Sequence, residues 1–600
     1  LAQEVFQSGI IPGDTDFRIF RDFGKIAGLD FAWSSNGYVY HTRLDNAAQI
    51  PLGTLQRTGD NILALTQRLV SAPEMNDVQA HSVGNLMFFD FLGAFIISWT
   101  DFIAAIVNST IIIFSIYTVY WNMIQSENEG MNRRVYLNQL LISSLTILVS
   151  WIVPLITTAV IAITLTKLDR AMSWFSRPIW LVFLYITPAM LVSMLVVLLV
   201  AKKQKHVVQS PWMLFRIYYD AGQVIFTSSV IFSIIFSILS GYLPAIWVLF
   251  SSVGNILRER IYSKVKDWRF LAIHILVFLL PFIQCGYTVN GALLLIVPIM
   301  GRSGSGNHAE LVLSLITAAM FLLMLSFLVP VILLVHNSKR VISMLLGVFF
   351  VAVLVLVLTP LGFPYSSYSV SPCPQRFMIL HVDKTFHNIQ GEVRRHDSGL
   401  WVVDLDVNSP HSVTSLVPDM KQAKLIVEDC ETELYCGLPY LIPVHTFIWK
   451  THWIAGTAPV ISIDTNLTLT SKELRENNVY RLSFKVVGPD HINIMLSPSK
   501  GLKLLKWSLV EGTPLVGPKW KERDTYFIYY SCASDPEPWE FWIDIQANPD
   551  HNGSLVDINL GGHFMHGAHQ TTVRLRRFFS EFPPWTVTSG WTAVLKAYVF

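Results

Sequence analysis

The chain has 600 residues, of which 52% are hydrophobic and only 14% are charged, whereas an average soluble domain is about 25% charged. The formal net charge of +2 argues against a nucleic-acid-binding protein, so we expect no nucleic-acid partner. Charge is depleted mainly between residues 89 and 360, where long apolar runs follow one another. We therefore expect three parts: residues 1–88, a membrane block at 89–360 and a second soluble domain at 361–600.

Residues 1–88 have the pattern of the end of a folded domain. The chain starts at Leu1 rather than at a methionine, and we expect it to be a fragment that lacks an N-terminal part. Breaker residues and apolar periodicity predict four elements: helical turns at Leu1–Gln7, a helix at Phe17–Phe23 capped by Asp14, Thr15 or Asp16, a strand at Leu29–Ala32 and a helix at Thr54–Val70.

Two motifs in this part carry a family resemblance. The sequence GDTDF at 13–17 and the sequence YHTRLD at 40–45 precede the last predicted helix. In order and spacing they resemble the C-terminal third of a co-catalytic zinc exopeptidase domain, the family of bacterial aminopeptidases and glutamate carboxypeptidase. With the membrane block behind these motifs, the whole arrangement resembles a membrane-anchored member of that family, which implies the endoplasmic reticulum membrane as its location.

The resemblance implies a site with two zinc ions about 3.5–4 Å apart that activate water against a peptide substrate. It makes His41 one zinc ligand and Tyr40 a catalytic residue whose hydroxyl polarises the substrate carbonyl. Asp45 would support the ligands from outside their shell or cap a helix. The other ligands of the family should precede Leu1. Since catalytic zinc needs about three protein ligands, we expect the fragment alone to be inactive.

The membrane block contains apolar runs close to the roughly 20 residues with which an α-helix crosses a bilayer. The runs lie at Ile103–Trp121, Leu140–Leu165, Ile179–Val200, Ala221–Leu257, Phe270–Thr288, Leu311–Val335 and Val341–Thr359. Ala221–Leu257 is either one long tilted helix or, as we prefer, a hairpin broken at Ser240–Pro244, because Gly and Pro favour a turn. The hairpin brings the prediction to about eight helices.

The charges of the loops favour an even number of crossings. With eight helices, alternate loops hold thirteen Lys and Arg residues on one side and four on the other. Cytoplasmic loops are enriched in these residues. We therefore expect a multi-pass protein in a lipid bilayer, with both soluble flanks in the lumen.

Five polar residues of the block are candidates for a pathway or a site: Asp101, Asn108, His274, Gln284 and Glu310. Asp101 and Glu310 lie near run ends, and we expect them to reach the interface. We expect His274 and Gln284 to bond to a neighbouring helix. The five form no repeated or paired pattern, and we find no inverted repeat of the transporter kind.

The C-terminal flank shows period-two alternation in short runs between turn residues, which predicts a β-sandwich. The alternating apolar residues are Val403, Leu405 and Val407, then Leu482, Phe484 and Val486, then Phe541, Ile543 and Ile545. Four cysteines fall here and allow three connectivities: Cys373, Cys430, Cys436 and Cys532. Two disulfides are expected in an oxidising lumen, and four reduced thiols are the alternative.

Two glycosylation sequons begin at Asn466 and Asn552 and support a lumenal location. A third, at Asn108, lies in a membrane run and should stay unmodified. The same flank holds His563, His566 and His569, spaced by three. On a strand this spacing points side chains to alternating faces, so we expect turn or surface histidines and no single metal site.

The sequence thus predicts a multidomain membrane protein with three kinds of fold: the remnant of an α/β zinc exopeptidase domain, a polytopic helical block and an all-β, sandwich-like lumenal domain. The leading functional hypothesis is a zinc metallo-exopeptidase of the endoplasmic reticulum membrane. The alternative is a polytopic transporter or scaffold with a degenerate peptidase-like domain, since the block is larger than anchoring requires. A third possibility is that the β domain binds a protein partner or the substrate.

Overall fold

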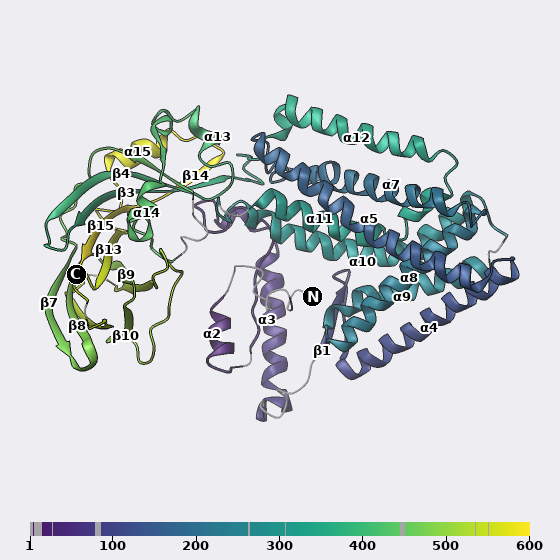
Figure 1. Ribbon diagram of the computed structural model, residues 1–600, viewed down its shortest axis with the longest axis horizontal. Helices are drawn as coiled ribbons and strands as arrows, with labels where there is room; N and C mark the ends of the chain where they lie inside the picture. Colours follow the sequence, from purple (N-terminus) through teal and green to yellow (C-terminus); the bar gives the residue numbers. More distant parts are fainter. Residues whose placement is uncertain are drawn as a thin grey trace. The chain divides into compact units, whose positions relative to one another are not determined.

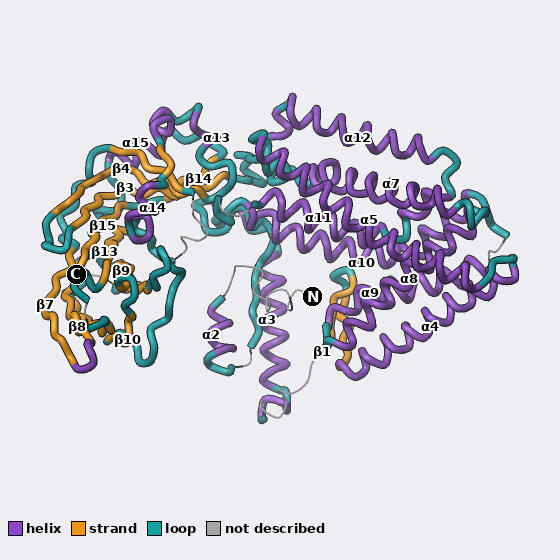
Figure 2. Tube along the Cα trace, viewed as in Figure 1, coloured by secondary structure: helices purple, strands orange, loops and turns teal. Residues whose placement is uncertain are grey.

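The structure is a computed structural model that describes residues 4, 15–26, 28–77, 86–261, 264–305, 308–443, 450–533, 536–549 and 551–600. It divides into two compact units. The first, a helical unit, comprises Leu1–Gly37, Asn46–Val297 and Glu310–Pro364, and the second, a β unit, comprises Tyr38–Asp45, Pro298–Ala309 and Tyr365–Phe600. Figure 1 labels the elements, and Figure 2 distinguishes the helices of one from the strands of the other. The predicted division at residues 88 and 360 stays a prediction.

The N-terminal part of the helical unit contains α2 (Asp16–Asp22) and α3 (Thr54–Val70), which confirm both predicted helices, and short 3-10 turns at Ala47–Gln49 and Pro73–Asn76. Thr15 occupies the N-cap of α2, but its hydroxyl donates to Asp30 Oδ2 at 2.6 Å rather than capping the helix. The predicted strand at Leu29–Ala32 is wrong, because no described segment pairs with these residues. The helical turns predicted at Leu1–Gln7, and Gly13 and Asp14 of the first motif, lie outside the described residues.

A β-hairpin that the sequence did not suggest precedes the membrane helices. It consists of β1 (Leu86–Phe91) and β2 (Phe95–Thr100), which pair antiparallel. Its turn uses positive φ at Leu92 and Gly93. Gln284 fixes the turn from α10 (Trp268–Met300), because its amide donates to the Asp90 carbonyl and accepts from Leu92 N–H.

The rest of the helical unit is a set of helices, which are α4 (Asp101–Asn128), α5 (Arg133–Lys167), α6 (Ile179–Leu181) continued by a π turn at Val182–Ile186 into α7 (Thr187–Gln204), α8 (Pro211–Ile235), α9 (Tyr242–Ile256) continued by a π turn at Leu257–Ile261, α10, α11 (Ala309–Leu325) and α12 (Ser338–Leu358). Within the described residues, six helices are long and apolar enough to cross a membrane: Asp101–Asn128, Arg133–Lys167, Ile179–Gln204, Leu239–Arg260, Trp268–Met300 and Ser338–Leu358. The structure therefore contains membrane helices, as predicted.

The apolar run at 221–257 is a hairpin, as preferred over one long helix. Helix α8 ends at Ile235, Ser237 takes a positive φ of 52°, and a 3-10 turn at Leu239–Gly241 leads into α9. At Gly241 a Cβ would lie 2.2 Å from the Ser233 hydroxyl oxygen, so the close approach of turn and helix requires a glycine. Helices α8 and α9 then run side by side in Figure 1.

Within its described residues, the β unit is built on two sheets. The larger has nine strands, in the order β11 (Tyr526–Ser531), β9 (His491–Pro498), β13 (Val556–Phe564), β15 (Thr592–Val599), β3 (Gln375–His387), β4 (Val393–Asp404), β6 (Thr451–Ala455) and β5 (Lys424–Leu425), with β14 (Thr586–Ser589) also pairing with β3. The smaller has the order β10 (Lys503–Trp507), β12 (Trp539–Gln546), β8 (Val479–Val487) and β7 (Asn466–Arg475). Short helices α13 (His411–Thr414), α14 (Glu428–Thr432) and α15 (Val573–Ser580) lie in the connections.

One end of the larger sheet packs on the smaller sheet through a shared apolar core. The inward residues of β8 and β12 are the alternating ones that the sequence identified, and all are at most 2% exposed: Leu482, Phe484, Val486, Phe541, Ile543 and Ile545. The alternation predicted for Val403, Leu405 and Val407 is wrong, because β4 ends at Asp404. Asp404 and Asp406 were expected to face outward. Both are instead buried and accept hydrogen bonds.

The domain contains one disulfide within the described residues, between Cys430 and Cys436, six residues apart. Cys373 and Cys532 carry thiols that donate to the carbonyl oxygens of Ser371 and Asp490. Of the two disulfides expected, the structure therefore forms one.

We expect Phe484→Ala to destabilise the β unit by about 3–5 kcal/mol, because a fully buried ring at the contact of both sheets leaves a cavity. Leu474→Ala is the matched control on the same sheet, since Leu474 is 62% exposed and such changes cost about 0.5 kcal/mol or less. Thermal unfolding of the purified chain, followed by tryptophan fluorescence, measures both. Equal melting temperatures would contradict the assigned core.

Candidate functional site

The segment that carries the YHTRLD motif forms a series of tight turns in the β unit. Thr42 donates its N–H and its hydroxyl to the Val39 carbonyl, at 3.0 and 2.6 Å, and its hydroxyl accepts from Leu44 N–H. His41 has a φ of 59°, in the left-handed region. Its ring stacks on Tyr40, with ring centroids 3.7 Å apart. The hydrogen bonds of this turn therefore hold the Tyr40 and His41 rings side by side.

Two arginines from distant parts of the chain surround this pair. The Arg302 guanidinium lies 4.6 Å from the Tyr40 ring centroid and donates to the Tyr40 carbonyl at 3.5 Å. Arg376, on β3, donates to the Tyr38 carbonyl at 2.9 Å. Burial lowers the pKa of Arg376 to about 10, with the positive charge of Arg302 as the smaller cause. The segment is thus fixed by cationic side chains on its carbonyl groups.

These surroundings lower the pKa of the His41 imidazole. Partial burial lowers its pKa, and the positive charges of Arg302 and Arg376 lower it further, while Asp45 opposes them. Because protonation is disfavoured, the ring keeps a nitrogen lone pair at lower pH than an ordinary histidine does. A metal ion binds only this neutral form of histidine. The direction of this pKa shift is therefore the one that favours a metal ligand.

The residues around His41 do not complete a metal centre by themselves. Among the residues that the structure describes, the one group of three or more His, Cys, Asp or Glu side chains with converging ligand atoms lies elsewhere and excludes His41. Zinc needs about three protein ligands. Tyr40 and Asp45 lie beside His41 in the chain, and both are exposed.

A second polar site lies inside the helical unit, where α8 carries a stripe of buried polar residues. Asp220 is fully buried at its centre, with one carboxylate oxygen accepting from Asn122 at 2.8 Å and from Asn255 at 3.2 Å. Its other oxygen accepts from the Tyr136 hydroxyl. Since these partners come from α4, α9 and α5, one carboxylate connects four helices.

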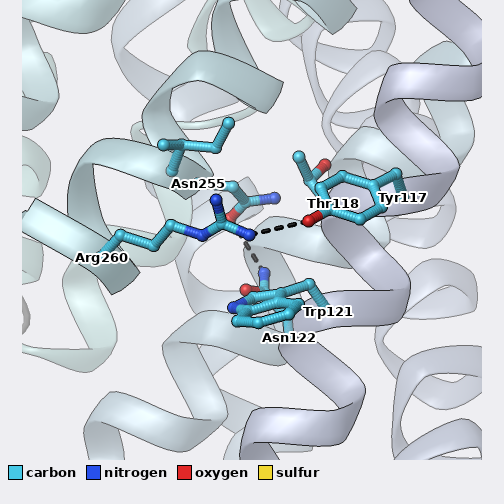
Figure 3. A pocket seen from close by; sticks show the side chains of 7 residues that line it. Tyr117, Thr118, Trp121, Asn122, Asn255 and Arg260 are labelled. Carbon is cyan, nitrogen blue, oxygen red and sulfur yellow. Dashed lines mark hydrogen bonds between the residues drawn. The ribbon is translucent and has the colours of Figure 1, made fainter.

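The next residue of the stripe extends the network. Gln223 donates through its side-chain nitrogen to Ser115, Thr118 and Ser252, at 2.8–3.0 Å, and its oxygen accepts from Asn255 at 2.5 Å. Figure 3 shows the small pocket beside the network, where Arg260 donates to the Tyr117 hydroxyl at 2.7 Å.

A signal for this network is present in the sequence, although the predicted site residues did not include it. Arg216, Asp220, Gln223 and Thr227 are separated by four, three and four residues, which places them on one face of a helix. On α4, the polar residues Ser115, Thr118, Asn122 and Ser126 follow the same spacing. A polar stripe on each of two apolar helices predicts that the stripes face each other.

The five polar residues chosen from the sequence have different environments. Glu310 is 1% exposed and accepts from Met172 N–H at 2.5 Å, from the Trp174 indole at 2.9 Å and from the Tyr185 hydroxyl, so the expectation that it reaches the interface is wrong. The position of Glu310 near a run end did not reveal these donors, because they come from a distant segment. Asp101 is exposed at the start of α4, and Asn108 is buried within it.

Of the two remaining residues of that set, His274 bonds just beyond the end of a neighbouring helix, and the expected bond to a helix is wrong for Gln284. His274 Nε2 donates to the Phe327 carbonyl at 2.9 Å, next to the end of α11. Gln284 bonds to the β1–β2 turn rather than to a helix.

The three histidines at 563–569 separate in the structure, and the expected turn or surface position is wrong for His563, which lies on β13. His563 is fully buried, accepts at Nδ1 from the Trp591 indole at 3.0 Å, and therefore donates from Nε2 to Asn493 at 2.8 Å. His566 lies 2.8 Å from Asp490, and His569 lies 2.8 Å from the Ser462 hydroxyl. No two of the three share a group of converging ligands among the described residues.

Family models match three parts of the chain. The model of peptidase family M28 matches residues 1–66, that of the endoplasmic reticulum metallopeptidase 1 TM domain matches residues 136–358, and that of the endoplasmic reticulum metallopeptidase 1 C-terminal domain matches residues 372–598. Endoplasmic reticulum metallopeptidase 1 of Mus musculus is 30% identical over 602 residues, and that of Rattus norvegicus is 31% identical over 604. Both alignments cover 100% of this chain and 66% of the relative.

The chain belongs to the endoplasmic reticulum metallopeptidase 1 family. The protein of that name from Homo sapiens is 30% identical over 602 residues, covering 100% of this chain and 65% of the relative. The chain thus spans about two thirds of the length of these members of the family. The membership confirms the predicted resemblance to a membrane-anchored metallopeptidase. The part that matches peptidase family M28 includes Tyr40, His41 and Asp45, whose roles stay predictions.

Removal of Glu259 should destabilise the helical unit of this family member more than removal of Glu129, although both pair with Arg216. Glu259 Oε2 lies 2.7 Å from the guanidinium with its side chain 7% exposed, whereas Glu129 is 42% exposed at 3.0 Å. Glu259→Gln leaves Arg216 and Arg258 buried without that charge, at a cost of about 3–5 kcal/mol. Glu129→Gln should cost about 0–1 kcal/mol. Thermal unfolding in detergent distinguishes the two, and similar melting temperatures would refute the buried pair.

Proposed function

We propose that this chain is part of a membrane-bound zinc metallopeptidase of the endoplasmic reticulum, which hydrolyses a peptide bond near a chain end. The observation that carries the proposal is that His41 lies in the part matched by peptidase family M28, with surroundings that lower its pKa. The names of the relatives, endoplasmic reticulum metallopeptidase 1, support both the activity and the location. The substrate class is a peptide.

In this proposal His41 provides one ligand to one of two zinc ions of the intact catalytic domain. When bound, the zinc pair supplies an activated water and polarises the scissile carbonyl. Within the described residues no converging ligands accompany His41, and the chain spans about two thirds of the length of its relatives. Tyr40, 46% exposed, offers a hydroxyl that can donate to the developing oxyanion. Asp45 acts to raise the pKa of His41, against the two arginines, as a nearby carboxylate does.

We expect His41→Ala in the full-length protein to lower kcat/KM for peptide hydrolysis by more than about 100-fold, since even the outer partners of metal ligands are worth roughly 10–100-fold. Bound zinc should fall in the same preparation. His206→Ala, which alters an exposed loop histidine of the helical unit, is the matched control and should keep both. Full activity of the His41→Ala protein would reject the ligand role.

The membrane arrangement is the second part of the proposal. We take α4, α5, α6–α7, α8, α9, α10, α11 and α12 as eight crossings, so that the peptidase part and the β domain share the lumen. The loop charges, thirteen against four, support this count. Helices α8 and α11 are the additional crossings beyond the six long apolar spans.

A lumenal β domain should carry sugar on Asn552, which is exposed in the connection between β12 and β13. Asn466 is half-buried and accepts from the Tyr598 hydroxyl at 2.7 Å, yet it should also be reached during synthesis. Endoglycosidase treatment should shift the gel mobility of the wild type, and Asn552→Gln should remove part of that shift. Thr110→Ala changes an exposed residue of α4 and destroys the sequon at Asn108, and it should leave the shift unchanged. An absence of any shift would reject a lumenal β domain.

A second candidate function, that of a transporter or scaffold, is favoured by the buried network around Asp220. An intramembrane carboxylate that connects four helices exceeds what anchoring requires. Complementation of cells that lack the protein separates the two functions. Rescue by His41→Ala together with failure of a normally expressed Asp220→Asn protein would support transport, and the reverse result supports the peptidase.

A further inference from the structure

A cluster of metal-binding side chains lies at one end of the neighbouring strands β9 and β13 of the large sheet, far in sequence from the peptidase motif. Strand β9 begins at His491, immediately after Asp490. Its neighbour β13 runs antiparallel, and their register places His563 opposite His491. Because β13 continues past the start of β9, the residues after Phe564 come beside Asp490, and His566 reaches it. The sheet register therefore brings together two segments about 75 residues apart in the sequence.

The ligand atoms of Asp490, His491 and His566 converge. All three lie within 4.8 Å of one another. His566 Nε2 is 2.8 Å from Asp490 Oδ2, and His491 Nδ1 is 3.4 Å from Asp490 Oδ1. In a tetrahedral zinc site, bonds of about 2.0–2.1 Å separate neighbouring ligand atoms by roughly 3.3 Å. The two separations to Asp490, one from each carboxylate oxygen, are close to this value, and the imidazole nitrogens of the two histidines lie within 4.8 Å of each other.

Two of these atoms have no hydrogen-bond partner. Asp490 Oδ2 and His491 Nδ1 are buried from solvent, and neither makes a hydrogen bond within the described part of the chain. The short approach of His566 to Asp490 lacks the angle of a hydrogen bond, although the atoms are close. A buried carboxylate oxygen and a buried ring nitrogen without partners are costly. A cation bound between them would satisfy both.

We propose that Asp490, His491 and His566 bind a zinc ion. Two imidazole nitrogens and one carboxylate oxygen form a donor set typical of zinc, and three protein ligands leave a position for water or an external ligand. Magnesium and calcium prefer sites made entirely of oxygen donors. The ion joins the start of β9 to the chain beyond β13, and so links the two strands at this end of the sheet. This site is independent of the proposed peptidase function, because its three residues lie outside the part that matches that family.

The neighbouring candidates do not belong to the site. His563 uses both ring nitrogens for Trp591 and Asn493. His569 bonds to Ser462. The thiol of Cys532, at the end of the adjacent strand β11, donates to the Asp490 carbonyl at 3.9 Å and stays outside the converging group. Among the residues that the structure describes, the site therefore has three protein ligands.

The test is zinc binding to the 600-residue chain, purified in detergent and freed of metal with a chelator. We expect one zinc per chain by elemental analysis after dialysis, and a rise in melting temperature when zinc sulfate is added, because binding stabilises only the folded state. His566→Ala should weaken zinc binding by at least about tenfold and remove the rise in melting temperature. His566 is 61% exposed, so this change should leave the fold intact.

His569→Ala is the matched control, since it removes another histidine of the same connection that contacts Ser462 instead. It should bind zinc as the wild type does. The His41→Ala chain should also keep this zinc, which distinguishes the site from the peptidase ligand. The proposal is overturned if the wild-type chain binds no zinc, or if His566→Ala and His569→Ala bind it equally well. Magnesium chloride at the same concentration should produce no shift, and an equal shift would contradict the assignment to zinc.

Discussion

The helical unit depends on the pairing of polar side chains that no water reaches. Apolar packing gives membrane helices little preference for one rotation, because lipid tails are as apolar as leucine. An unpaired polar group in that environment costs several kcal/mol. The polar stripe of α8 can avoid this cost only where Asn122, Tyr136 and Asn255 are within reach of Asp220. The requirement therefore selects which faces of α4, α5, α8 and α9 meet.

The same requirement shapes the β unit where its chain enters the sheet. Asp406 is fully buried and accepts from the Tyr365 hydroxyl at 2.7 Å and from the Gln375 amide at 3.0 Å. Burial raises the pKa of Asp406 to about 6, although these donors favour the carboxylate. The folded domain thus gains stability from this group as the pH falls through about 6 toward the ordinary value of an aspartate. These hydrogen bonds join the entering chain at Tyr365 to the start of β3 at Gln375.

The sequence predicted features that depend on residues close together in the chain, and it missed features that depend on distant residues. Helix α3 and the alternation in β8 and β12 depend on neighbours a few residues apart, so periodicity located them. Glu310 depends on Trp174 and Tyr185, well over a hundred residues away, and its burial had no local sign. The β1–β2 hairpin was missed because its apolar residues merge with the run that begins α4. The cluster of Asp490, His491 and His566 depends on the register of β9 and β13, which the spacing of the histidines by three does not reveal.

The environment of His41 combines all three of the regions that match family models. The histidine itself lies in the part matched by peptidase family M28, Arg302 in the part matched by the TM domain, and Arg376 in the part matched by the C-terminal domain. Both guanidiniums lower the pKa of the ring after burial has done so. A peptidase domain without these regions would lose the two cations that add to the lowering of this pKa. The membrane block and the β domain thus contribute to the chemistry of a residue that the sequence assigns to the peptidase part alone.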